Sequence, residues 1–162
     1  MTAGYPVFRI HLWNFSMRRF YMIQILLLTH AELAEGFQSA VNLIIGEQPC
    51  FEVLGLKFGQ GLEEYTGIVH KTAESIASVD GTLIFADIFG GTPGNTAGKL
   101  LLEKWPYGGF PFGCIAGVNL SLLMEALTMR ESMDFAALKT HLMALFPETV
   151  VDLETALNLQ PQ

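Results

Sequence analysis

Hydrophobic residues occur along the chain in two alternating patterns. Short, nearly continuous apolar runs alternate with longer stretches in which apolar residues recur every three or four positions. The short runs are typical of strands covered on both faces, and the longer pattern is typical of amphipathic helices. We therefore expect strands at 23–28, 51–58, 82–86 and 114–118, and helices at 31–45, 62–76, from Thr92 onward, 120–130 and 135–145.

This alternation predicts an α/β fold with a doubly wound, mostly parallel sheet and helices on both faces. The expected strand order is 2-1-3-4, as in flavodoxin-like folds. The tail after Pro147 leaves two interpretations open, because 149–151 fits an extra edge strand and 153–157 fits a helical turn.

Length and composition agree with a well-filled core. A chain of 162 residues fits one domain, and 51% hydrophobic with 15% charged residues excludes a disordered protein. Nine basic against sixteen acidic residues give a net charge of −7, the wrong sign for a protein that binds nucleic acid. The apolar run at 20–28 is far shorter than the roughly 20 residues that span a bilayer.

The two cysteines show no spacing typical of a disulfide framework or a metal site. Cys50 and Cys114 each lie in an apolar segment and outside any CxxC pattern. We expect buried thiols in a reducing cytoplasm.

Two polar residues follow neighbouring strands of the predicted sheet. His30 comes after the first strand and Asp87 after the third. Strands one and three flank the crevice at the carboxyl edge in this strand order, so we expect the two side chains to meet there. The carboxylate would fix the Nδ1–H tautomer and leave Nε2 as a nucleophile. Alone, either residue would be an ordinary junction residue, and the pairing carries the information.

The segment Gly90-Gly91-Thr92-Pro93 indicates an anion site beside this pair. Glycines let the backbone turn N–H groups toward an anion, and a helix N-terminus presents free donors and a positive dipole end. Threonine followed by proline predicts an N-cap and a first helical residue. An ordinary capped turn would carry the same four residues.

The remaining polar candidates indicate no second site. His11, His70 and His141 have no metal-type spacing, and we interpret them as structural or solvent-facing. The glutamates at 32, 35, 63 and 64 fit solvated helix faces. The sequence has no Walker loop, GxGxxG fingerprint or GxSxG elbow.

Residues 22 to about 131 resemble the IIA component of the mannose family of the phosphoenolpyruvate-dependent sugar phosphotransferase system (PTS). The apolar run ending in Thr29-His30 is similar to the family's first strand and active histidine. Residues 87–95 fit the family's Asp-x-x-Gly-Gly-Ser/Thr-Pro-x-Asn segment, and 115–120 form a third, weaker match.

The resemblance implies a phosphotransferase with a phosphohistidine intermediate. His30 would carry the phosphoryl group and Asp87 would orient it. Gly90, Gly91 and Thr92 would stabilise its oxygens, while Asn95 and Asn119 would brace the crevice. The family implies no metal or cofactor.

The same resemblance implies the partners. The donor would be the histidine-containing phosphocarrier protein and the acceptor a IIB component, a separate chain here. The membrane IIC and IID permease would be reached indirectly. A cytoplasmic homodimer is also implied, and the sugar stays open.

Residues 1–21 have no counterpart in the family pattern, which leaves 22–162 as a single IIA domain. Either Met22 is the biological start, or 1–21 form an arm that packs on the sheet or on a second copy. Two functional alternatives also remain. One is the phosphocarrier subunit of a phosphoenolpyruvate-dependent dihydroxyacetone kinase, and the other is a non-catalytic regulatory module on the same fold.

Overall fold

The computed structural model describes residues 22–103 and 109–159. The predicted N-terminal extension 1–21, His11 within it, and residues 104–108 of the loop before the fourth strand lie outside the described residues.

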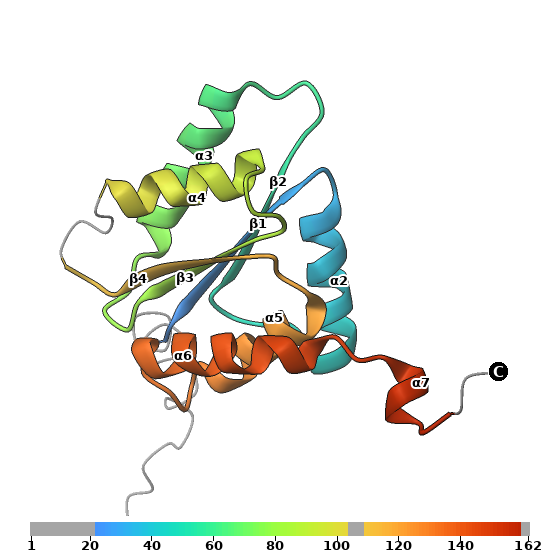
Figure 1. The fold of residues 1–162 in the computed structure, drawn as a ribbon. Coiled ribbons are helices and arrows are strands. Elements are labelled where there is room, and N and C mark those ends of the chain that lie inside the picture. The colour runs from blue at the N-terminus through green and yellow to red at the C-terminus, as the bar shows by residue number, and fades with distance from the viewer. Residues whose placement is uncertain (1–21, 104–108, 160–162) are drawn as a thin grey trace, which may run out of the picture.

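Four parallel strands form one sheet in the order β2-β1-β3-β4, which confirms the predicted order (Figure 1). The central strand β1 pairs with β2 from Ile25 opposite Phe51 to His30 opposite Leu56, and with β3 from Gln24 opposite Thr82 to Leu28 opposite Ala86. The strands are β1 (Gln24–His30), β2 (Phe51–Leu56), β3 (Thr82–Ala86) and β4 (Phe112–Ala116).

Helices cover both faces of the sheet, as the alternation of patterns predicts. Figure 1 shows α3 and α4 on one side and α5 and α6 on the other, where α2 also packs. The helices are α2 (Leu33–Ile45), α3 (Leu62–Ile76), α4 (Thr92–Leu102), α5 (Leu120–Met129), α6 (Phe135–Leu145) and α7 (Leu153–Ala156), with a 3-10 turn η2 (Phe146–Thr149).

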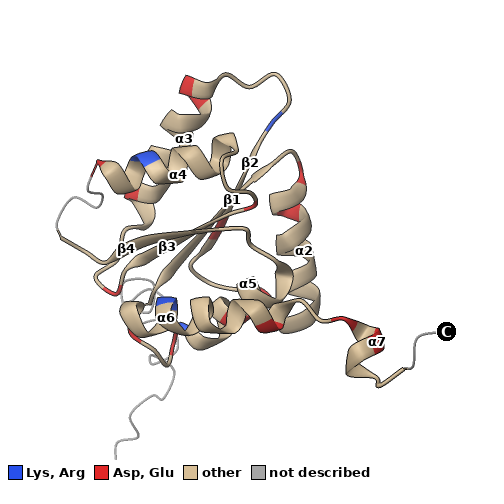
Figure 2. Ribbon diagram, viewed as in Figure 1, with Lys and Arg blue, Asp and Glu red and all other residues tan. Residues whose placement is uncertain are grey.

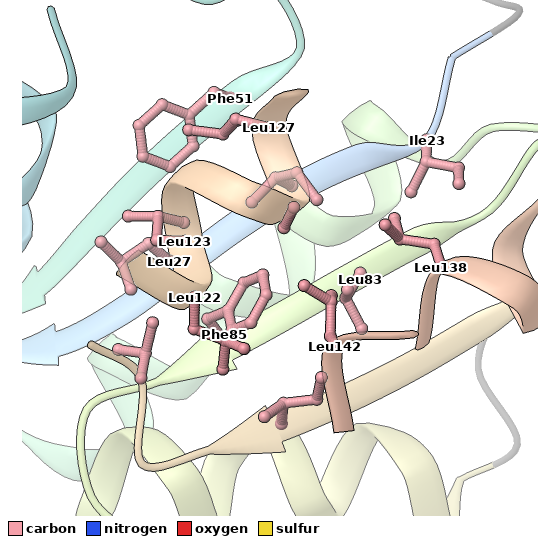
Figure 3. Close-up of a cluster of buried hydrophobic side chains, with 14 of the residues drawn as sticks. Ile23, Leu27, Phe51, Leu83, Phe85, Leu122, Leu123, Leu127, Leu138 and Leu142 are labelled. Carbon is pink, nitrogen blue, oxygen red and sulfur yellow. The ribbon is translucent and has the colours of Figure 1, made fainter. Parts of the chain in front are cut away.

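The side chains of β1 alternate between two hydrophobic clusters. Ile25 and Leu27 belong to the cluster under α2, α5 and α6, whereas Leu26 and Leu28 belong to the cluster under α3 and α4. Figure 3 shows the first cluster, in which Leu27 lies among side chains from β2 and α5. All four side chains are fully buried, which explains why the strand reads as a continuous apolar run.

Most differences from the predicted elements lie at their ends. β1 includes His30, α2 begins at Leu33 rather than at residue 31, and β2 ends at Leu56 rather than at residue 58. β4 spans Phe112–Ala116 instead of 114–118. Apolar side chains continue past the last paired residue in such segments, so hydrophobicity alone does not locate the end of a strand.

The tail after Pro147 contains a short helix, as the second of its two interpretations predicts. Within the described residues the sheet has four strands, and residues 149–151 form no edge strand. Asp152 caps α7 by accepting a hydrogen bond from the N–H of Glu154 at 3.1 Å. A capped turn satisfies these backbone groups locally without a strand partner.

Arg130 anchors the edge of the molecule opposite the carboxyl ends of the strands. Its guanidinium is buried and donates to the carbonyls of Pro49 and Cys50 at 2.5 and 2.8 Å. Burial lowers the pKa of this side chain from its ordinary value. The two bonds tie the start of β2 to the end of α5.

The cysteines are free thiols and are less buried than expected. Cys50 and Cys114 are both partly exposed. Burial of the sulfur nevertheless raises the pKa of Cys114 to about 11, which disfavours the reactive thiolate. Within the described part of the chain, no helix combines the length and apolar character needed to cross a membrane.

Leu27→Ala tests the core, with Leu43→Ala as its matched control. Leu27 is fully buried and Leu43 is 87% exposed. We expect Leu27→Ala to lower the free energy of unfolding by about 3 kcal/mol, because it removes buried methyl groups and leaves a cavity. Leu43→Ala should change it by less than about 0.5 kcal/mol. Urea denaturation measures both, and equal losses would contradict the core assignment.

Candidate functional site

His30 and Asp87, which the sequence predicts to pair, meet at the carboxyl ends of β1 and β3. His30 is the last residue of β1, and Asp87 follows directly after β3. The N–H of Asp87 donates to the carbonyl of Leu28 at 3.1 Å, which extends the pairing of the two strands past Ala86. Parallel pairing therefore brings together two residues that are 57 positions apart.

One oxygen of Asp87 holds both the backbone and the ring of His30. Asp87 Oδ2 lies 2.8 Å from the His30 backbone nitrogen and 2.8 Å from ring Nδ1. The other oxygen, Oδ1, accepts from the N–H of Ile88 at 2.8 Å. Because a carboxylate only accepts, Nδ1 carries the proton, and in the neutral ring Nε2 keeps its lone pair.

Burial differs between the two side chains of the pair. The Asp87 side chain is 10% exposed, whereas that of His30 is 44% exposed. The carboxylate is shielded from water, and the imidazole remains accessible to another molecule. This arrangement fits a group that reacts at the surface while a buried partner orients it.

Gly91 borders the Nε2 edge of the imidazole. A Cβ at this position would lie 2.7 Å from His30 Cε1, 2.8 Å from Ile88 Cγ2 and 3.3 Å from His30 Nε2. Those distances leave no room for a side chain. Gly90 before it has a φ of 83°, which glycine adopts without strain. Backbone atoms thus approach the ring where other residues would place a side chain.

The N-terminus of α4 begins at this point. Gly91 is the N-cap, with Thr92 and Pro93 as the first two helical residues. The predicted threonine N-cap is therefore wrong by one residue, because the extended backbone of the N-cap falls on Gly91, whose Cβ position is blocked by His30. Among the residues that the structure describes, no side chain caps this helix end, so its first N–H groups and its positive dipole end are available to an anion.

Asn95 and Asn119 have different contacts. Asn95 Nδ2 donates to the carbonyl of Gly90 at 3.1 Å, which braces the glycine turn from the first turn of α4. Asn119 caps α5 by accepting from the N–H of Leu122 at 2.8 Å, and its Nδ2 donates to Thr149 Oγ1 at 2.7 Å. These bonds join α5 to η2 rather than reaching the histidine, so a role for Asn119 in bracing the crevice stays a prediction.

Three exposed apolar side chains near the crevice were not predicted as site residues. Ile88 and Phe89 are 55% and 89% exposed, and Phe58 is fully exposed. Ile88 and Phe89 lie between Asp87 and the glycines, and Phe58 lies two residues beyond Leu56, the partner of His30. We call these three residues the apolar rim. The sequence gives no signal for them, since apolar residues next to a strand are read as core.

The other polar candidates pair elsewhere. His141 Nε2 lies 2.6 Å from Glu125 Oε1, and His70 Nε2 lies 3.7 Å from Glu103 Oε2. Glu35 forms an ion pair with Lys57, which lowers the pKa of the Glu35 carboxyl mainly through the hydrogen bond from Lys57. Among residues 22–103 and 109–159, no group of three His, Cys, Asp or Glu side chains could hold a metal ion.

Known proteins that are similar in sequence include EIIA components of sugar phosphotransferase systems. The PTS system sorbose-specific EIIA component of Lacticaseibacillus casei is 32% identical over 126 residues, which cover 78% of this chain and 87% of that protein. The PTS system fructose-specific EIIA component of Bacillus subtilis (strain 168) is 27% identical over 124 residues, covering 76% and 82%.

Solved structures show the same fold. The crystal structure of phosphotransferase system component EIIA from Streptococcus agalactiae superposes with a TM-score of 0.74 and 26% identity, covering 83% of this chain and 99% of that one. The model of the EIIA-man family, described as PTS system fructose IIA component, matches residues 24–143. The chain therefore belongs to the mannose- and fructose-type IIA components of the sugar phosphotransferase system.

Proposed function

We propose that this IIA component accepts a phosphoryl group on His30 Nε2 and passes it to a IIB component, with the histidine-containing phosphocarrier protein as donor. The observation that carries the proposal is the hydrogen bond of 2.8 Å between His30 Nδ1 and the buried carboxylate of Asp87, beside an uncapped helix N-terminus. Residues 22–162 would form the single domain that performs this transfer.

The contacts of Asp87 fit the charge that develops on the ring. When the Nε2 lone pair bonds to phosphorus, the bond between phosphorus and the donor nitrogen breaks, and the ring that keeps its Nδ1 proton becomes positively charged. Asp87 Oδ2 lies 2.8 Å from Nδ1, the nitrogen that carries that proton, and the carboxylate stabilises the charge. Its bond to the His30 backbone also fixes the ring before the reaction, which reduces the entropy cost of alignment.

The end of α4 fits the oxygens of the transferred group. Gly91 and Thr92 lie at the helix N-terminus on the Nε2 side of the ring, where free N–H groups attract anions. In the proposal these amides and the Thr92 hydroxyl stabilise the phosphoryl oxygens, while Gly90 allows the turn and Asn95 holds it. Phosphoryl transfer depends mainly on such positioning and charge stabilisation.

The apolar rim supports a protein as donor and as acceptor. Phe58, Ile88 and Phe89 expose large apolar surfaces at the edge of the sheet that holds His30. A small phosphorylated metabolite would not cover such side chains, whereas protein interfaces bury aromatic residues at their centres.

We further propose that the protein acts as a cytoplasmic homodimer and serves the membrane IIC and IID permease only through IIB. The exposed apolar side chains of Val150, Leu153 and Leu157 in the tail support a second copy as a partner, because the described part of the chain leaves them exposed to water.

His30→Ala tests the acceptor. The protein is incubated with phosphoenolpyruvate, the first enzyme of the system and the phosphocarrier, and acid-labile phosphate on the chain is measured. We expect the wild type and the control His141→Ala to be labelled and His30→Ala to be unlabelled, because His30 is the only histidine in 22–103 and 109–159 whose ring lies at the N-terminus of α4. Label retained by His30→Ala would reject the site.

Asp87→Asn tests the orienting charge. An amide keeps the shape of the side chain but offsets no positive charge on the ring, so we expect phosphorylation to slow by at least about tenfold. Asp80→Asn, at the opposite edge of the sheet, serves as the control. Rapid-quench kinetics measure the rate and circular dichroism checks the fold; an unchanged rate in a folded Asp87→Asn would remove Asp87 from the mechanism.

Gly91→Ala tests the space beside Nε2. The new methyl group would sit about 3.3 Å from the attacking nitrogen and would press on the ring. We expect the phosphorylation rate to fall about a hundredfold, as small displacements at a reacting centre cost that much. Gly98→Ala is the control, since nothing lies within 4 Å of a Cβ there. Equal rates in the two variants would show that the close approach is not needed.

A further inference from the structure

Ala31, the residue after His30, has a backbone conformation that is unfavourable for alanine. Its φ is 51°, in the left-handed region that glycine and asparagine adopt more readily. The Ala31 side chain is exposed, so its packing does not stabilise this conformation. Strain of this kind persists only where the surrounding structure enforces it, and it concentrates at functional sites.

Contacts with β2 hold this turn in place. The N–H of Ala31 donates to the carbonyl of Leu56 at 2.8 Å, just beyond the point where His30 pairs with Leu56. Thr29 pairs with Gly55 one step earlier. The hydrogen bonding between β1 and β2 therefore continues past the histidine and fixes the peptide group that follows it.

Gly55 provides the space that the turn requires. A Cβ on Gly55 would lie 2.0 Å from the Ala31 carbonyl oxygen and 3.2 Å from its carbonyl carbon. The obstructing atoms are main chain, so no side-chain rotation relieves the contact. Any side chain at position 55 must displace the backbone directly after His30.

The two neighbouring strands thus fix His30 from opposite sides. On the β3 side, Asp87 Oδ2 binds both the His30 N–H and Nδ1. On the β2 side, the following residue is held by Leu56 and lies against Gly55. An ion pair between Glu35 of α2 and Lys57 after β2 links the same two segments at the surface. Figure 2 shows acidic positions in red at the start of α2 and a basic position in blue in the loop after β2.

We propose that Gly55 is a positioning residue for phosphoryl transfer, which acts by accommodating the strained turn at Ala31 and so placing the His30 ring for attack. This inference rests on the proposed function. It assigns a role to a residue of β2 that has no reactive group and lies 25 positions from the histidine (55 − 30).

Gly55→Ala is the direct test, with Gly98→Ala as the matched control. We expect the maximal phosphorylation rate of Gly55→Ala to fall about a hundredfold, because the shifted turn moves the His30 ring out of line with the phosphoryl group that it attacks. The phosphocarrier concentration that gives half the maximal rate should stay unchanged, since the apolar rim is not altered. A wild-type rate in folded Gly55→Ala would overturn the proposal. A changed half-saturating concentration at an unchanged maximal rate would also overturn it and would indicate a docking role.

Two further variants separate positioning from general damage to the fold. Adding Ala31→Gly to Gly55→Ala should restore at least about tenfold in rate, because glycine adopts alternative backbone angles without penalty. Ala31→Val changes only an exposed side chain, yet valine tolerates positive φ poorly, so it should also slow the transfer. If Gly55→Ala does not fold, a wild-type rate in Ala31→Val would overturn the proposal.

Nitrogen-15 NMR of the His30 ring separates failure of this inference from failure of the proposed function. In the wild type we expect a protonated Nδ1 and an unprotonated Nε2, as the bond to Asp87 requires. Gly55→Ala should show a mixture of tautomers. Identical ring signals in both proteins would reject the positioning role even if neither protein accepts phosphate. Absence of phosphate on the wild type, by contrast, would reject the proposed function alone.

Discussion

The carboxylate of Asp87 is the contact on which the site depends. It binds the backbone and ring of His30 through one oxygen and the N–H of Ile88 through the other. Its own position follows from the parallel pairing of β1 with β3, which brings the two strand ends to the same edge. Since Asp87 is mostly buried, its attraction for the imidazole is screened less than it would be in water. The register of the sheet thus determines the tautomer of a histidine.

The second constraint on the site is the close approach of main-chain atoms to His30 and to the residue after it. Gly91 borders the reactive edge of the ring, and Gly55 borders the residue that follows it. His30 therefore lies between two main-chain segments that cannot rotate out of the way as side chains can. A site built in this way is organised before its substrate arrives, which suits a reaction that depends mainly on alignment and charge stabilisation.

One side of the His30 ring is packed against the protein, and the other side is exposed to solvent. Asp87 and Gly91 border the ring on the buried side, while the exposed apolar side chains of the rim follow the ends of β2 and β3, the two strands that pair with β1. This asymmetry fits the proposed exchange with two protein partners in turn, because each must reach the same nitrogen. The fixed pair His30 and Asp87 also lies beside the exposed apolar rim that a partner would bury.

The amino-acid sequence was enough to predict the fold class, the strand order and the meeting of His30 with Asp87. The fold class depends on local patterns, because a buried parallel strand requires a continuous apolar run and a neighbouring helix requires a periodic one. The strand order and the meeting of the two residues follow from the flavodoxin-like arrangement of such elements. The glycine segment at 90–91 was also recognised as a candidate anion site, because glycines before a helix start turn N–H groups toward an anion, although an ordinary capped turn would carry the same residues.

Apart from that pair, the contacts between segments that are distant along the chain became known only from the tertiary structure. The imidazole leaves no room for a side chain at Gly91, which is the N-cap of α4, and contacts with β2 hold the strained turn at Ala31. The apolar rim could not be distinguished from core, because exposure depends on where a strand ends rather than on residue type. Sequence patterns report which face of an element is buried, whereas distances between main-chain atoms arise only when the elements pack.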